Sequence, residues 1–131
     1  MQIRLAETAG FCFGVERAVA LAEQTARTCK NAVTLGPIIH NRHVVERFER
    51  LGLHEISSAE EAEPGQTVVI RAHGIPVSEQ RMLSARGAAA VDATCPFVKK
   101  IHVIAQKAER DGRSLLIIGT PTHPEVAAIA S

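Results

Sequence analysis

Two short runs of apolar and β-branched residues constrain the fold of this chain more than any other feature. Residues 67–70 and 115–118 have no polar alternation, so both faces of each strand are expected to be buried. Strands of this kind are typical of a parallel sheet with helices on both faces. Helical periodicity fills the intervals between strand-like runs along the whole chain, and the predicted fold class is therefore α/β.

The other predicted elements alternate in the same way. Further strands are predicted at residues 2–6, 32–35, 53–56 and 88–91. Helices are predicted at about 15–30, after Asn41, and at the prolines Pro76, Pro96 and Pro124. The helix that starts at Pro96 should bury one apolar stripe, made of Phe97, Val98, Ile101, Ile104, Ala105 and Ala108.

Composition excludes several classes of function. The formal net charge of the 131 residues is +1, and no cluster of Lys and Arg stands out as an electrostatic footprint for nucleic acid. The chain has no Trp, no Tyr and four Phe, which leaves little aromatic surface on which bases could stack. No apolar run is long enough to span a bilayer, and the N-terminus has no signal-peptide core. We therefore expect a cytoplasmic protein without a nucleic-acid or membrane partner.

Five cysteine and histidine residues share one kind of position in this pattern. Each lies where a predicted strand gives way to a predicted helix: Cys12, His40, His73, Cys95 and His123. In parallel sheets, ligands bind beyond the carboxyl ends of the strands and at helix N-termini. We expect these side chains to line one site. Three other histidines lie inside elements and are expected at the surface or in a supporting position: His43, His54 and His102.

The sequence partly overlays itself when it is shifted by 83 positions. The shift places Cys12 on Cys95 and His40 on His123, so that a cysteine precedes a histidine by 28 residues in each copy. It also places strand 32–35 on residues 115–118. We interpret this as a duplicated α/β unit. The chain then divides into an N-terminal strand and cysteine loop (1–13), a first unit (14–94) and the start of a second, truncated unit (95–131).

Two matched cysteines at helix starts suggest a metal centre between the units. Zinc takes four protein ligands, or three in a catalytic site, and an iron–sulfur cluster takes three or four thiolates. Cys29 is a poor third ligand, because it lies about 25 Å along the helix from Cys12 and belongs to an apolar stripe. The third ligand is therefore expected in a further copy beyond residue 131. The odd number of cysteines also argues against a disulfide framework.

Five motifs, in this order, resemble one enzyme family. They are Gly-Phe-Cys-Phe-Gly-Val at 10–15, His-Asn at 40–41, Ala-His-Gly at 72–74, Asp-Ala-Thr-Cys-Pro at 92–96 and His-Pro-Glu-Val at 123–126. Together they resemble 4-hydroxy-3-methylbut-2-enyl diphosphate reductases, which catalyse the last step of the non-mevalonate isoprenoid pathway. The resemblance covers the whole chain. It implies three similar, pseudo-symmetric α/β units around one [4Fe-4S] cluster, of which this chain holds one complete unit and part of a second. The strand at 2–6 is then expected to pair with the third unit.

The resemblance also implies a role for each motif residue. Cys12 and Cys95 would be two of three cluster ligands. Glu125 would deliver a proton to the departing hydroxyl, and His123 would be its neighbour in the substrate pocket. His40 and His73 would contact the diphosphate and the rest of a small allylic substrate. Electrons would come from a ferredoxin or a flavodoxin.

Three other interpretations of the same residues stay open from the sequence. One is a zinc-dependent hydrolase that uses the two cysteines and histidines. Another is a phosphate-binding α/β module without redox chemistry. A third is a structural or degenerate remnant, because two thiolates do not complete a cluster that needs three. We expect the chain to be an N-terminal fragment that by itself has no turnover and holds a cluster poorly or not at all.

Overall fold

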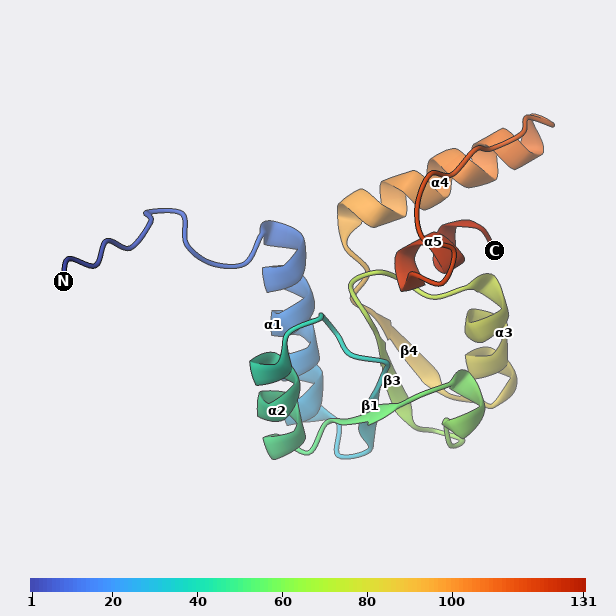
Figure 1. Ribbon diagram of the computed structural model, residues 1–131. Helices are drawn as coiled ribbons and strands as arrows, with labels where there is room; N and C mark the ends of the chain where they lie inside the picture. Colours follow the sequence, from blue (N-terminus) through green and yellow to red (C-terminus); the bar gives the residue numbers. More distant parts are fainter.

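The computed structural model describes residues 1–131 and contains one four-stranded parallel sheet in the order β2-β1-β3-β4 (Figure 1). The strands are β1 (Ala32–Leu35), β2 (His54–Ile56), β3 (Thr67–Ile70) and β4 (Ala89–Asp92). The helices are α1 (Phe13–Thr28), α2 (Arg42–Arg50), α3 (Val77–Ala85), α4 (Pro96–Arg110), α5 (Pro124–Ile129) and the 3₁₀ turn η1 (Ala59–Glu61). The prediction of an α/β fold with a parallel sheet is confirmed.

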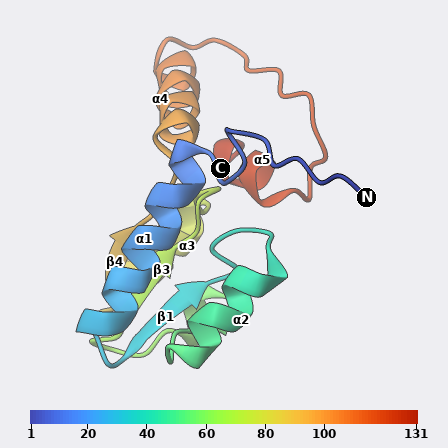
Figure 2. The same ribbon diagram turned by 90° about the vertical axis from the view of Figure 1, so that its left-hand side faces the viewer.

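Helices cover both faces of the sheet, as the apolar strands predict. On one face, α1 and α2 pack on the side that includes Ala32 and Val69 (Figure 2). On the other face, α3 and η1 cover Val33 and Val68. Neighbouring residues in the central strands β1 and β3 thus point into two separate hydrophobic cores, which is why these strands lack polar alternation.

Local signals in the sequence position several of these elements. The Asn41 side chain accepts a hydrogen bond from the Val44 N–H (3.2 Å) and caps α2, as predicted. Pro96 occupies the first turn of α4, where no backbone donor is required. Strands β1 and β3 have the predicted bounds, β2 begins one residue later than predicted, and β4 is shifted by one residue at both ends.

The strand order places a switch point at the two central strands. The chain leaves β1 for β2 on one side and then returns to β3 on the other side. The loops that follow β1 and β3 lie next to each other at the carboxyl edge of the sheet, at the position where open α/β sheets bind ligands. Helices α4 and α5 lie beyond one end of the sheet (Figures 1 and 2).

Two predicted strands are wrong in this structure. Residues 2–6 and 115–118 form no strand, and their large side chains are exposed, with Ile118 93% accessible. A strand of a parallel sheet needs a neighbouring strand to accept its backbone hydrogen bonds. The sheet of the first unit ends at β2 and β4, and no other strand of the chain lies beside either segment. The N-terminal segment instead extends away from the sheet (Figure 1).

The predicted burial of α4 is wrong for the same reason. Phe97, Ile101 and Ile104 are exposed, and no residue of α4 is fully buried. Helix α1, in contrast, packs its apolar stripe on the sheet. No strand lies beside α4 to provide a surface on which its stripe could pack. No helix in the structure combines the length and the hydropathy that a membrane span requires.

Two phenylalanines provide a test of this difference between the helices that pack on the sheet and α4. Phe48 is 3% exposed in the core beneath α2, whereas Phe97 is 69% exposed on α4. We expect Phe48→Ala to lower the free energy of unfolding by about 3–5 kcal/mol, because it leaves a cavity. Phe97→Ala should change it by less than about 0.5 kcal/mol. Urea unfolding of both variants measures the two values, and equal losses would contradict the observed packing of α4.

Candidate functional site

One residue, Ala72, ties together three loops at the carboxyl edge of the sheet through its backbone N–H and its backbone carbonyl. The Ala72 N–H, just after β3, donates to the Ile38 carbonyl in the loop after β1 (3.1 Å). The Ala72 carbonyl accepts from the Cys95 N–H in the loop after β4 (2.9 Å). The side chains of these loops are therefore held in a fixed relation to one another, and the loops carry His40, His73 and Cys95.

Three of the predicted histidines come together at this edge. The ring centroids of His40 and His73 are 4.7 Å apart, and those of His73 and His123 are 5.7 Å apart. The His123 ring closes the group at 6.2 Å from His40. His123 also caps α5, because its Nδ1 accepts the Glu125 N–H (3.2 Å). The structure thus groups the histidines that the sequence placed at three separate junctions, while their roles stay predictions.

His73 is the most perturbed member of this group. Burial lowers its pKa, and the positive charges of His40, His123 and Arg71 lower it further, while Glu125 acts in the opposite direction. The Nδ1 atom of His73 is buried and has no hydrogen-bond partner. Buried polar atoms are nearly always paired in proteins. The unpaired Nδ1 among three imidazoles therefore marks a position for a polar ligand.

The two predicted cysteine ligands also lie close together. Cys12 is the N-cap residue of α1 and Cys95 that of α4, and neither side chain caps its own helix. The Cys95 Sγ lies against Gly14, where a Cβ atom would collide with it. Gly14 is two residues after Cys12 in the first turn of α1. Both thiols therefore lie at helix N-termini, where the helix dipole and free N–H groups favour negative charge.

Two polar residues that sequence reasoning did not select hold the Cys95 loop. Arg17 of α1 donates from Nη1 to the Thr94 carbonyl (3.3 Å) and so joins α1 to the residue before Cys95. Asp92 accepts the Thr94 N–H (2.9 Å) and forms an ion pair with Lys99 (2.6 Å). The sequence offers one signal for Asp92, which is its place in the motif at 92–96 directly after a strand.

The thiols of this chain match part of a cluster ligand set. Cys12 and Cys95 supply sulfur donors at adjacent helix ends, which suits iron, but no group of three or more His, Cys, Asp and Glu side chains is arranged to hold a metal ion. Cys29 ends α1 at its far end and packs, half-buried, against the core. Cys29 therefore does not supply the third protein ligand that a catalytic zinc ion or an iron–sulfur cluster takes.

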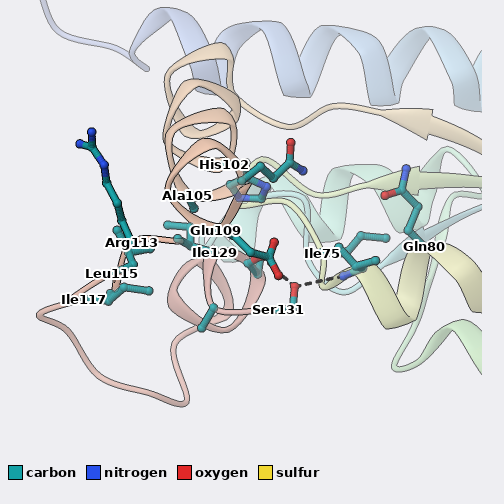
Figure 3. Close-up of a pocket in the computed structure, with 14 residues that line it drawn as sticks. Ile75, Gln80, His102, Ala105, Glu109, Arg113, Leu115, Ile117, Ile129 and Ser131 are labelled. Carbon is teal, nitrogen blue, oxygen red and sulfur yellow. Dashed lines mark hydrogen bonds between the residues drawn. The ribbon is translucent and has the colours of Figure 1, made fainter. Parts of the chain in front are cut away.

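A cavity of about 440 Å³ lies apart from these groups (Figure 3). Residues of α3, α4 and α5 line it, together with Leu115 and Ile117. Its lining includes neither Cys12 nor Cys95 and none of the three grouped histidines. His102 lies at its wall and packs its ring on Gly74, next to His73, which fits its predicted supporting position.

Fold and site together define a class: a parallel α/β unit that gathers two thiols and three imidazoles beyond the carboxyl ends of its strands. The chain belongs to the family described as LytB protein, which matches residues 3–131. Over 131 residues it is 43% identical to the 4-hydroxy-3-methylbut-2-enyl diphosphate reductase of Citrifermentans bemidjiense. The reductase of the same description from Aquifex aeolicus is 46% identical over 127 residues, which are 96% of this chain.

Solved structures agree with the family. One of the (E)-4-hydroxy-3-methyl-but-2-enyl diphosphate reductase, the terminal enzyme of the non-mevalonate pathway, superposes with a TM-score of 0.83 at 44% identity and covers 98% of this chain. The reductase of Plasmodium falciparum gives a TM-score of 0.87 at 29% identity over 94% of this chain. The chain spans 46% of the length of the Citrifermentans relative and 44% of the Aquifex relative. These proteins are thus similar to this chain over about half of their own length.

Gly14 offers a test of the approach of the two cysteines. In Gly14→Ala the new methyl group must displace the Cys95 thiol by about 1 Å or more to reach van der Waals distance. In a Cys29→Ser background, a short reagent that bridges two thiols should therefore link Cys12 to Cys95 less efficiently than without the alanine. Ala20→Gly in the same helix is the control, since residue 20 is exposed. Equal yields of the cross-link by mass spectrometry would contradict the observed contact.

The lowered pKa of His73 predicts how stability depends on pH. The folded protein resists protonation of His73, whereas the unfolded chain binds the proton near the ordinary histidine pKa of about 6.5. His73 therefore contributes stability above that pH, and the contribution is lost as the pH falls through the folded pKa. Histidine-ring NMR should show His73 titrating below the ordinary histidine pKa of about 6.5. Urea unfolding at pH 7.5 and 5.5 should show a smaller loss in His73→Gln, and an equal loss would contradict the assignment.

Proposed function

We propose that this chain forms the cluster-binding and diphosphate-binding part of an iron–sulfur reductase. The reaction removes the hydroxyl of 4-hydroxy-3-methylbut-2-enyl diphosphate and yields isopentenyl and dimethylallyl diphosphate. The observation that carries the proposal is that two cysteines at helix N-termini and a group of three histidines lie beyond the carboxyl ends of the strands of one parallel sheet. Relatives that share this segment at 43–46% identity bear the name of this reductase.

Cys12 and Cys95 would hold a [4Fe-4S] cluster together with a third thiolate from outside residues 1–131. Helix N-termini stabilise thiolates, and both cysteines occupy such a position. Gly14 leaves the first turn of α1 without a side chain at the point where Cys95 approaches. When bound, the cluster supplies the electrons that no amino-acid side chain can supply.

The histidines would bind the diphosphate of the substrate. Burial and the two neighbouring imidazoles, His40 and His123, lower the pKa of His73, and an anion beside the three rings would offset this repulsion of a proton. The exposed His40 and His123 rings leave the group open to solvent, so a diphosphate could enter from that side. Each imidazole could donate a ring N–H to a phosphate oxygen.

Glu125 would hold the proton that leaves with the substrate hydroxyl as water. It lies in the first turn of α5, and its backbone N–H is fixed by His123. Its charge acts on His73, so the carboxyl group lies within electrostatic range of the proposed diphosphate site. A carboxyl group placed beside the departing hydroxyl can act as a general acid.

The electron donor and the compartment complete the proposal. A ferredoxin or a flavodoxin in the cytoplasm would deliver the two electrons of the reductive dehydroxylation. The competing function, phosphate binding without redox chemistry, is supported by the histidine group alone. It differs from the reductase function in that it assigns no role to Cys12 and Cys95.

A chimera tests the proposal. Residues 1–131 replace the matched segment of the Aquifex aeolicus reductase, and the purified protein is reconstituted anaerobically with iron and sulfide. We expect it to reduce 4-hydroxy-3-methylbut-2-enyl diphosphate. Cys12→Ser and Cys95→Ser should each lose cluster and activity, and Glu125→Gln should keep the cluster but lose at least about 100-fold in rate. Cys29→Ser, at the far end of α1, is the matched control and should keep both.

Several results would argue against this assignment. Cysteine variants that retain full iron, sulfide and diphosphate binding would favour the phosphate-binding module. A folded chimera with a complete cluster and no reductase activity would contradict the reaction. The 131-residue chain alone should show no turnover and hold iron poorly, so robust activity of that chain would overturn the view that it supplies two of three ligands.

A further inference from the structure

Arg71 bridges the two loops that carry His40 and His73. It directly follows β3, and its Nε donates to the Gly74 carbonyl (3.2 Å), on the far side of His73. Its Nη1 lies over Gly36, the first residue after β1, where a Cβ would be only 2.6 Å from that nitrogen. One guanidinium group therefore touches the start of the loop that leads to His40 and the end of the turn that presents His73.

Both glycines in these contacts have backbone angles that favour glycine. Gly36 has a φ of 70° and Gly74 a φ of 79°. A side chain at Gly36 would displace the guanidinium, and one at Gly74 would meet the ring of His102. The absence of a side chain at Gly36 leaves room for the Arg71 guanidinium. Its absence at Gly74 leaves room for the His102 ring beside the turn at 71–74.

Burial of the Arg71 guanidinium costs free energy, and no carboxylate forms an ion pair with it. Burial lowers the pKa of the guanidinium, and the more distant Glu79 and Glu55 oppose this. None of the ion pairs of the chain includes Arg71. A half-buried cation without a carboxylate partner is disfavoured for stability alone. Its hydrogen bond and its packing on Gly36 indicate what it contributes instead, which is the relative position of two loops.

We propose that Arg71 is a positioning residue that sets the spacing of the His40 and His73 rings. The role requires the shape of arginine as well as its charge, because Nε contacts Gly74 while Nη1 of the same guanidinium lies over Gly36. The proposal rests on the function proposed above only for the identity of the ligand, a diphosphate. The spacing of the two rings is a property of the chain itself.

Histidine-ring NMR of the 131-residue chain tests this role. We expect Arg71→Lys and Arg71→Met both to lose the nuclear Overhauser contact between the His40 and His73 rings and to shift the His73 signals. The ring of His54, which is exposed on β2, should not move. Arg81→Met, which removes an exposed arginine from α3, is the matched control and should leave all these signals unchanged. Titration with inorganic pyrophosphate should show binding weakened about tenfold in Arg71→Lys.

The outcomes distinguish positioning by Arg71 from a role of its charge alone and from a role in the stability of the whole sheet. If Arg71→Lys keeps the wild-type ring contact, arginine supplies only charge and the proposal is wrong. If both variants unfold, Arg71 supports the whole sheet rather than two loops, which also overturns it. If the wild-type chain does not bind pyrophosphate while both variants still lose the ring contact, positioning by Arg71 is supported and the diphosphate function is contradicted.

Discussion

The arrangement of this site depends on the two backbone hydrogen bonds of Ala72. The Ala72 N–H is bonded to the loop after β1 and the Ala72 carbonyl to the loop after β4, so three neighbouring strands of the sheet share one hydrogen-bonded edge. His73 follows directly in sequence, and Cys95 is the donor to the carbonyl. The same residue therefore connects the loop that carries His73 with the loop that carries Cys95, and Arg71 and Arg17 hold the loops on either side.

The structure of residues 13–92 could be predicted from the sequence because the strands and helices of this segment pack on one another. Each of its strands finds a neighbour, and β1 and β3 bury both faces between α1, α2 and α3. The structure of residues 96–131 could not be predicted in the same way. Residues 115–118 have the apolar pattern of β1, but a strand also requires partners for its backbone, and pattern alone does not supply them. Helix α4 formed from local signals and remained exposed.

The residues of the site also differ in how far the sequence could predict them. The cysteines and histidines could be found because each stands at a junction of strand and helix, and parallel sheets bring such junctions to one edge. Gly14, Arg17 and Arg71 could not be assigned, because their contacts join segments that are far apart in the sequence. Asp92 could be predicted in part, since its hydrogen bond to the Thr94 N–H is local. Its ion pair with Lys99 joins the end of β4 to the first turn of α4.

The central claim is that Cys12 and Cys95 are two of the ligands of one iron–sulfur cluster. Mössbauer spectroscopy of the chimera, enriched in ⁵⁷Fe and reconstituted without oxygen, tests it most directly. We expect the spectrum of a cubane cluster in which one iron lacks a cysteine ligand, and its loss when either Cys12 or Cys95 is replaced by serine. An unchanged cluster spectrum in both serine variants would contradict the account.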